Sequence, residues 1–132
     1  MSTAQEWTPP ELRSQDELRA MLAYVTENGY GSTSKTYVQG ILAALSWVTG
    51  AAGNSPITGV SLGRPVTGKE ASAEHGRAYE ALYPTSDPAL WQVTQDRGQD
   101  YTLAVEHTLA WATGGDVGLL VPADWPWPQE RP

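Results

Sequence analysis

Cysteine is missing from this chain of 132 residues. Its absence excludes disulfide bonds, thiolate nucleophiles, zinc sites with sulfur ligands and iron–sulfur clusters. Phenylalanine is also absent, so six tryptophans and six tyrosines supply all of the large aromatic volume. Each of these side chains carries a polar group that needs a hydrogen-bond partner when it is buried. We expect no cofactor and no resident metal ion.

Positive charge is scarce: eight Lys and Arg stand against 15 Asp and Glu, which gives a formal net charge of -7. Since nucleic-acid binding needs a positive surface that neutralises phosphates, we expect no nucleic-acid partner. No stretch approaches the ~20 consecutive apolar residues that span a bilayer, and the first residues lack the basic and apolar regions of a signal peptide. We therefore expect no membrane association and a soluble, cytoplasmic protein.

The length suits one domain covering residues 1–132, because two separate cores would each be too small. Helix signals predict an all-α fold, an irregular bundle of four to five helices with Gly/Pro-rich loops. The sequence also allows one minor β element, a short strand or hairpin arm in "ITGVSL", residues 57–62. Residues 1–8 and 122–132 are expected to form N- and C-terminal arms, the second rich in proline and favouring polyproline II.

The first predicted helix covers residues 11–27. Apolar residues recur in it at i, i+3, i+4 and i+7, which places them on one face: Leu18, Met21, Leu22 and Val25. Thr8 and Glu11 have the spacing of a capping box, and Ser14 with Glu17 repeats that spacing for a later start. Four further helices are predicted, over residues 35–49, 68–82, 86–95 and 99–113.

The segment 35–49 is apolar on all sides rather than along one stripe, which is typical of a helix that is buried or that contacts partners on two sides. Four of its residues and the Gly50 that follows it have a counterpart 64 positions later (101 minus 37): Tyr37, Leu45, Trp47, Thr49 and Gly50 match Tyr101, Leu109, Trp111, Thr113 and Gly114. Either a two-helix unit is duplicated, or two helices solve the same packing problem. Both readings predict that these helices form the centre of the bundle.

The stretch "GRPVTGKE", residues 63–70, resembles a phosphate-binding loop but carries Glu70 where the motif needs Ser or Thr. A carboxylate there would repel the phosphate, and Pro65 removes one amide donor. Thr67 and Glu70 instead have the spacing of a capping box for the helix that follows. We favour helix capping over phosphate binding.

The histidines are His75 and His107, each preceded by glutamate. Neighbouring residues on a helix point about 100° apart, so neither Glu-His pair can chelate a metal ion alone. A metal site would require the predicted helices 68–82 and 99–113 to face each other. Because no serine lies in a G-x-S-x-G motif, nucleophilic catalysis also lacks support, and we expect no catalytic residues.

Three functional hypotheses remain open. The leading one is a non-enzymatic protein–protein interaction or assembly module, whose partner is either another protein or a second copy in a homodimer. Its candidate interaction residues are Trp47, Trp91, Trp125 and Trp127. The last three lie near or beyond helix ends, where the alternative reading makes them lids over the core. The alternative is a small-molecule-binding protein or enzyme with an aromatic-lined pocket around His107, formed by Tyr37, Tyr101, Glu106, His107 and Trp111. A weaker alternative is an acidic decoy that inhibits a nucleic-acid-binding enzyme.

Overall fold

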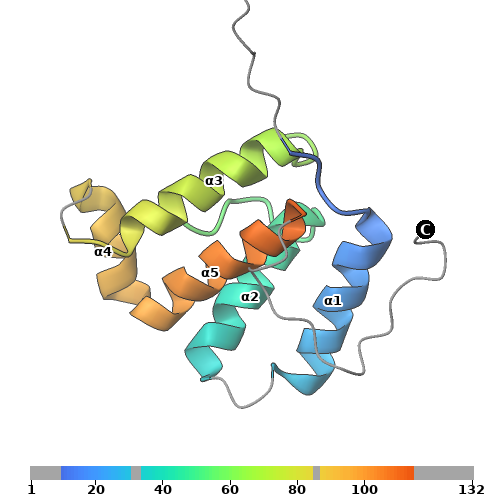
Figure 1. Cartoon of the computed structure of the whole chain (residues 1–132), viewed down its shortest axis with the longest axis horizontal. Coiled ribbons are helices and arrows are strands. Elements are labelled where there is room, and N and C mark those ends of the chain that lie inside the picture. The colour runs from blue at the N-terminus through green and yellow to red at the C-terminus, as the bar shows by residue number, and fades with distance from the viewer. Residues whose placement is uncertain (1–9, 31–33, 85–86, 115–132) are drawn as a thin grey trace, which may run out of the picture.

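The computed structural model describes residues 10–30, 34–84 and 87–114, and within these ranges the chain forms an all-α bundle (Figure 1). The bundle is built from α1 (Gln15–Asn28), α2 (Lys35–Val48), α3 (Gly68–Ala81), α4 (Pro88–Arg97) and α5 (Gln99–Ala112). The predicted fold class is confirmed. The expected arms, residues 1–8 and 122–132, lie outside the described residues. The minor β element is reduced to an isolated antiparallel bridge between Asn54 and Ser61.

Helices α2 and α5 form the centre and run side by side in the same direction, with α1 beside α2 and α3 beside α5 (Figure 1). Their N-terminal ends are joined because the Ser34 hydroxyl, the N-cap of α2, donates to Asp100 Oδ2 at 2.7 Å. Helix α4 packs against α3 and α5. The predicted central position of the two matching helices is confirmed.

The two central helices touch most closely at Gly40 on α2 and Ala104 on α5. A Cβ added to Gly40 would lie 2.5 Å from the Tyr101 carbonyl oxygen and 2.7 Å from Ala104 Cβ. Glycine is therefore required here by the approach of two backbones. Gly40 and Ala104 are also related by the 64-residue displacement (104 minus 40), so equivalent positions of the two matching helices meet.

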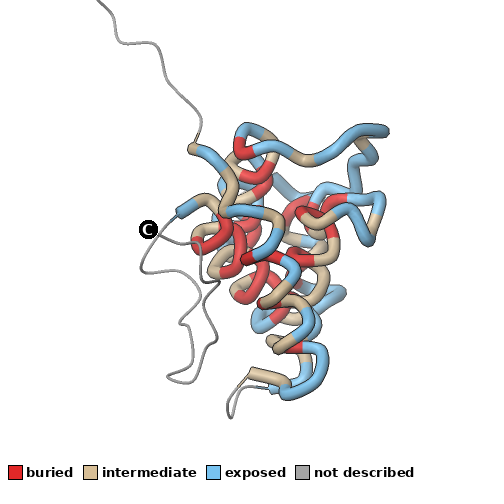
Figure 2. The backbone as a smooth tube through the Cα atoms, turned by 90° about the vertical axis from the view of Figure 1, so that its right-hand side faces the viewer, coloured by how far each residue is buried: buried red, intermediate tan, exposed pale blue. Residues whose placement is uncertain are grey.

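One apolar core occupies the middle of the molecule, and Figure 2 shows the buried stretches gathered there with exposed stretches around them. The predicted inner face of α1 is confirmed, since Leu18, Met21 and Val25 are buried. Helix α2 packs between α1 and α5, and partly buried Leu42 and Val38 also contact the core. Its all-round apolar character is thus used inside the molecule and gives no separate argument for a subunit interface.

Helix α1 begins at Gln15, not at residue 11. Its N-cap is Ser14, whose hydroxyl accepts from the Glu17 amide at 3.2 Å. The preceding segment is engaged elsewhere: Pro10 crosses directly over Gly68, and the Arg13 amide donates to the Ala112 carbonyl at 2.8 Å. These contacts with α3 and α5 outweigh the local helix signal.

Helices α4 and α3 each begin after a residue whose polar groups cap the helix. Helix α4 begins at Pro88 with Asp87 as its N-cap, not at residue 86, because Asp87 Oδ1 accepts from the Ala89 amide at 2.8 Å. Before α3, the predicted capping box is confirmed: Glu70 Oε1 accepts from the Thr67 amide at 2.8 Å. The carboxylate that spoils the phosphate motif is therefore committed to helix capping.

Candidate functional site

Four polar side chains from three helices form a hydrogen-bonded group, which we call the histidine cluster. The Tyr37 hydroxyl, in the first turn of α2, lies 2.9 Å from His107 Nδ1 on α5. His107 Nε2 lies 3.5 Å from Glu106 Oε1, and Glu106 Oε2 lies 2.7 Å from His75 Nε2 on α3. The carboxylate of Glu106 therefore stands between two imidazoles.

The packing of α5 between α2 and α3 creates the histidine cluster. Adjacent residues on a helix differ by about 100° in direction, so His107 reaches toward α2 while Glu106 reaches toward α3. Burial, and then the charges of Glu106 and Asp100, raise the pKa of Tyr37. A neutral Tyr37 hydroxyl can donate a hydrogen bond to His107 Nδ1.

Further tyrosines extend this cluster on both sides. The Tyr30 ring stacks on Tyr37 with centroids 6.2 Å apart, and burial followed by the charge of Tyr37 raises the pKa of Tyr30 to about 12. At the other end Tyr79 and Tyr83 meet edge to face at 5.4 Å. Their exposed fractions, 53% and 48%, make them two of the most exposed large apolar side chains of the described residues.

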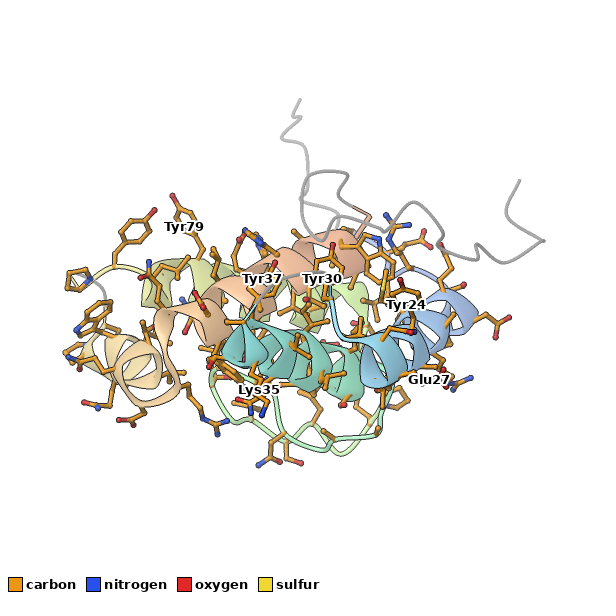
Figure 3. All side chains as sticks on the ribbon, turned by 90° about the horizontal axis from the view of Figure 1, so that it is seen from below. Tyr24, Glu27, Tyr30, Lys35, Tyr37 and Tyr79 are labelled. Carbon is orange, nitrogen blue, oxygen red and sulfur yellow. The ribbon has the colours of Figure 1, made fainter. Side chains whose placement is uncertain are left out.

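We define the tyrosine–histidine face as the surface formed by these side chains: Tyr30, Tyr37, His75, Tyr79, Tyr83, Glu106 and His107. Figure 3 shows Tyr79, Tyr37 and Tyr30 on the upper side of the molecule, whereas the loop between α2 and α3 runs along the lower side. The face thus crosses α3, α5 and α2 in turn. It combines aromatic area with fixed hydrogen-bonding groups.

The histidine cluster does not form a metal centre with other acids. Within residues 10–30, 34–84 and 87–114, no group of three or more His, Asp or Glu side chains has an arrangement that could hold a metal ion. Helices α3 and α5 do face each other, as a metal site would require, but Glu106 is hydrogen-bonded to His75 and lies 3.5 Å from His107 Nε2.

The structure brings together only part of the predicted pocket. Tyr37, Glu106 and His107 meet, but Tyr101 lies on another side of α5, where its hydroxyl donates to the Pro56 carbonyl at 3.0 Å. The guanidinium of Arg97 lies 5.1 Å from the centre of the Tyr101 ring. Tyr101 therefore anchors the loop between α2 and α3 rather than joining the histidine cluster.

Trp111, the last predicted pocket residue, is 2% exposed and packs beneath Arg13. The Arg13 guanidinium lies 4.6 Å from the centre of the indole, and its Nε donates to the Trp111 carbonyl at 2.6 Å. This contact ties the segment before α1 to the C-terminal end of α5. Four of the cavities among the described residues are lined by neither Trp111 nor His107, so a pocket around His107 stays a prediction.

The candidate interaction tryptophans have different surroundings. Trp47 is 3% exposed and belongs to the core, so it offers little surface to a protein partner. Trp91 is half-buried on α4. Trp125 and Trp127 lie outside the described residues. Their role in binding stays a prediction.

Sequence reasoning missed the structural role of Glu74. Glu74 is 4% exposed and accepts from the Ile57 amide at 2.6 Å and from the Thr58 amide at 2.9 Å. The Thr58 hydroxyl donates to its other oxygen at 2.8 Å. Its regular helical spacing from Glu70 gave no signal of these partners, because they lie in a distant loop.

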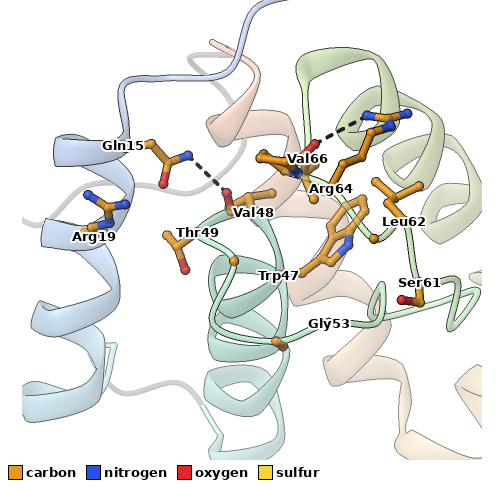
Figure 4. A pocket seen from close by; sticks show the side chains of 14 residues that line it. Gln15, Arg19, Trp47, Val48, Thr49, Gly53, Ser61, Leu62, Arg64 and Val66 are labelled. Atoms are coloured by element: carbon orange, nitrogen blue, oxygen red, sulfur yellow. Dashed lines mark hydrogen bonds between the residues drawn. The ribbon is translucent and has the colours of Figure 1, made fainter.

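A groove, which we call the Arg19 groove, lies between α1, the C-terminal end of α2 and the loop at residues 61–66 (Figure 4). Its volume is about 550 Å³. Arg19 and Gln15 on α1 face Trp47, Leu62 and Val66 across it. Of the residues that line this groove, only Trp47 was a predicted site residue, as a candidate for protein interaction.

None of the helices in the described ranges combines the length and apolar character needed to cross a membrane. Comparison of the chain with family models, with curated proteins and with solved structures gave no significant match.

Proposed function

We propose that this protein is a non-enzymatic interaction module that docks a protein partner on the tyrosine–histidine face. The observation that supports this proposal is the pair Tyr79 and Tyr83, about half-exposed, beside a hydrogen-bonded cluster of Tyr37, Glu106 and two histidines. Tyrosine is enriched among the residues that dominate binding energy, because it offers a large rigid surface and a hydroxyl group.

The geometry favours docking over chemistry at this face. The ionisable groups of the histidine cluster bind one another, and none of the four described cavities adjoins His107 or Glu106. A surface whose side chains are already held by mutual contacts loses little conformational entropy on binding. The face is therefore suited to recognise a protein surface with complementary apolar and polar groups.

The partner is either a different protein or a second copy of this chain. A photo-activated cross-linking residue at position 79 distinguishes these cases. We expect irradiation of cells producing the variant to give one discrete cross-linked species. A mass of twice the chain identifies self-association, and any other mass identifies a heterologous partner. The matched control carries the same residue in place of Val60, which is 51% exposed on the loop of the opposite side.

The comparison between positions 79 and 60 decides the proposal. A cross-linked species from position 79 that is absent from position 60 supports docking on the tyrosine–histidine face. Equal products from both positions, or none from position 79, contradict it. The aromatic pocket and acidic decoy hypotheses gain no support from a specific contact: the first lacks a cavity among the four described, and the second rests on net charge alone.

A further inference from the structure

The Arg19 groove differs in charge from the chain as a whole. Acidic residues outnumber basic ones by 15 to 8 in the sequence, yet the described residues that line this groove include two arginines and no Asp or Glu. A concave, cationic surface on an acidic protein concentrates anions locally. The charge of the groove therefore selects for an anionic ligand.

The two arginines are not equivalent. Arg64 Nη2 lies 3.0 Å from Glu70 Oε2, so its charge is largely offset by that ion pair. Arg19 is exposed and makes no hydrogen bond or ion pair with the described residues. A guanidinium has a planar set of donors that fits a carboxylate or sulfonate. The unneutralised charge that a ligand would meet thus comes from Arg19.

The wall opposite Arg19 is apolar. It is formed by Trp47, Leu62 and Val66, and Trp47 is held in place because it is almost fully buried. The volume of about 550 Å³ lies within the range of small-molecule sites. A ligand that fills the groove would place its apolar body on this wall while its charged end meets Arg19.

The walls of the groove are held in place by hydrogen bonds and an ion pair within the protein, so they are in position before a ligand binds. Gln15 Nε2 donates to the Val48 carbonyl at 3.1 Å and holds α1 to the end of α2. On the other side, the Arg64–Glu70 pair and the capping box at Thr67 hold the loop to α3. A preformed groove reduces the entropy that binding must overcome.

The geometry points to a binding site in the Arg19 groove for a small organic acid with an apolar, ring-containing body. This site is independent of the proposed docking face, because the groove adjoins the loop on the opposite side of the molecule. Failure of either proposal leaves the other standing.

Two fluorescent probes test the pairing of charge and apolar surface. Anilinonaphthalene sulfonate carries an anionic group on an aromatic body, and N-phenyl-naphthylamine has the same body without that group. We expect the sulfonate to bind the wild type saturably and Arg19→Gln about fivefold more weakly. The affinity of the neutral probe is expected to be unchanged by Arg19→Gln and to fall in Leu62→Ala.

The control variant is Lys35→Gln, which removes one positive charge at the opposite end of α2. It is expected to keep the wild-type affinity for both probes. Equal weakening in Lys35→Gln and Arg19→Gln would show that only net charge matters and would overturn the proposal. So would sulfonate binding that is unaffected by Arg19→Gln. Circular dichroism of each variant checks that the fold is intact.

Two further measurements fix the place and the ligand class. In amide NMR spectra, the sulfonate should shift the signals of Gly53 and Gly63, which line the groove, and leave Gly76 on α3 unchanged. Naphthoate should displace the bound sulfonate, whereas inorganic phosphate should not. Shifts confined to residues outside the groove, or displacement by phosphate alone, would overturn the assignment.

Discussion

Glu70 shows how one carboxylate holds two backbone segments at a helix start. It accepts from the Thr67 amide at 2.8 Å within the capping box and pairs with Arg64 at 3.0 Å. Hydrogen bonds from Arg64 and Thr67 lower the pKa of Glu70 from 4.5 to about 2. The folded state therefore prefers ionised Glu70 more strongly than the unfolded state does.

This preference predicts a pH-dependent contribution of Glu70 to stability. Because the folded pKa is the lower one, the contribution is complete above about pH 4.5 and is lost as the pH falls toward 2. We expect Glu70→Gln to lower the free energy of unfolding by about 1 kcal/mol at pH 7, since the pair with Arg64 faces solvent. The difference from wild type should shrink below pH 4.5, as measured by urea unfolding across this pH range.

Glu80→Gln is the matched control, because Glu80 pairs with Arg77 on an exposed part of α3 with side chains 50% and 56% exposed. Its effect should be smaller than that of Glu70→Gln at pH 7. A constant difference between Glu70→Gln and wild type from pH 7 to pH 2 would refute the linkage.

Single residues were predictable from the sequence when their partners lay nearby in the chain. The capping role of Glu70 followed from its spacing to Thr67, three positions away. Glu74 was not predictable, because the amides that it accepts from lie 16 and 17 positions earlier in a loop. Tyr37 and His107, which lie 70 positions apart, were expected to meet only as members of an aromatic pocket, and their hydrogen bond itself had no local signal.

At the scale of the helices, the contact between α2 and α5 depends on the absence of a side chain at Gly40. The Tyr101 carbonyl and the Ala104 side chain leave no space for a methyl group there. Glycine normally weakens a helix interior by about 1 kcal/mol relative to alanine. The close approach of the two helices must therefore contribute more than that local cost.

We expect Gly40→Ala to lower the free energy of unfolding by about 1–3 kcal/mol, because overpacking at the helix contact outweighs the gain in helix propensity. The same substitution at Gly76 on α3 meets no atom within 4 Å of the added Cβ. Gly76→Ala should raise the free energy of unfolding by about 0.5–1 kcal/mol. Urea unfolding of both variants measures the contrast, and stabilisation by Gly40→Ala would show that the helices can separate without loss.

The helices themselves were largely predictable because each has a local start signal and an apolar pattern. The exceptions show where tertiary contacts prevail. Residues 11–14 carry a helix signal, but Arg13 reaches the end of α5 instead of adding a turn to α1. The sequence of residues 57–62 suggests a strand. The amides of Ile57 and Thr58 are instead bound to Glu74, and the segment belongs to the loop between α2 and α3, with a single β-bridge at Ser61.

For the whole molecule, the burial pattern predicts a gradient of local stability. Helices α2 and α5 lie at the centre and supply many of the buried core residues, whereas α4 contributes only Leu90 and Thr94. Amide groups in regions with few buried contacts open more readily. We expect hydrogen exchange to be slowest in the middle of α2 and α5 and faster in α4.

Native-state hydrogen exchange measured by NMR checks this order. Amides of Ile41 and Val105 should exchange only through global unfolding, so their opening free energies should equal the value from urea unfolding. Amides of α4 should open at lower cost. Equal protection of α4 and α5 would mean that the bundle opens as one unit and would contradict the gradient.

The parallel course of α2 and α5 has a consequence for synthesis on the ribosome. The two helices are separated by a loop, α3 and α4, so α2 leaves the exit tunnel well before the helix that covers its Gly40 side. Until then the apolar surface of α2 that α5 covers in the folded protein stays exposed on the growing chain. Contacts between segments far apart in the sequence form late in folding. A nascent chain that stalls before residue 99 would be a substrate for chaperones rather than a smaller version of the fold.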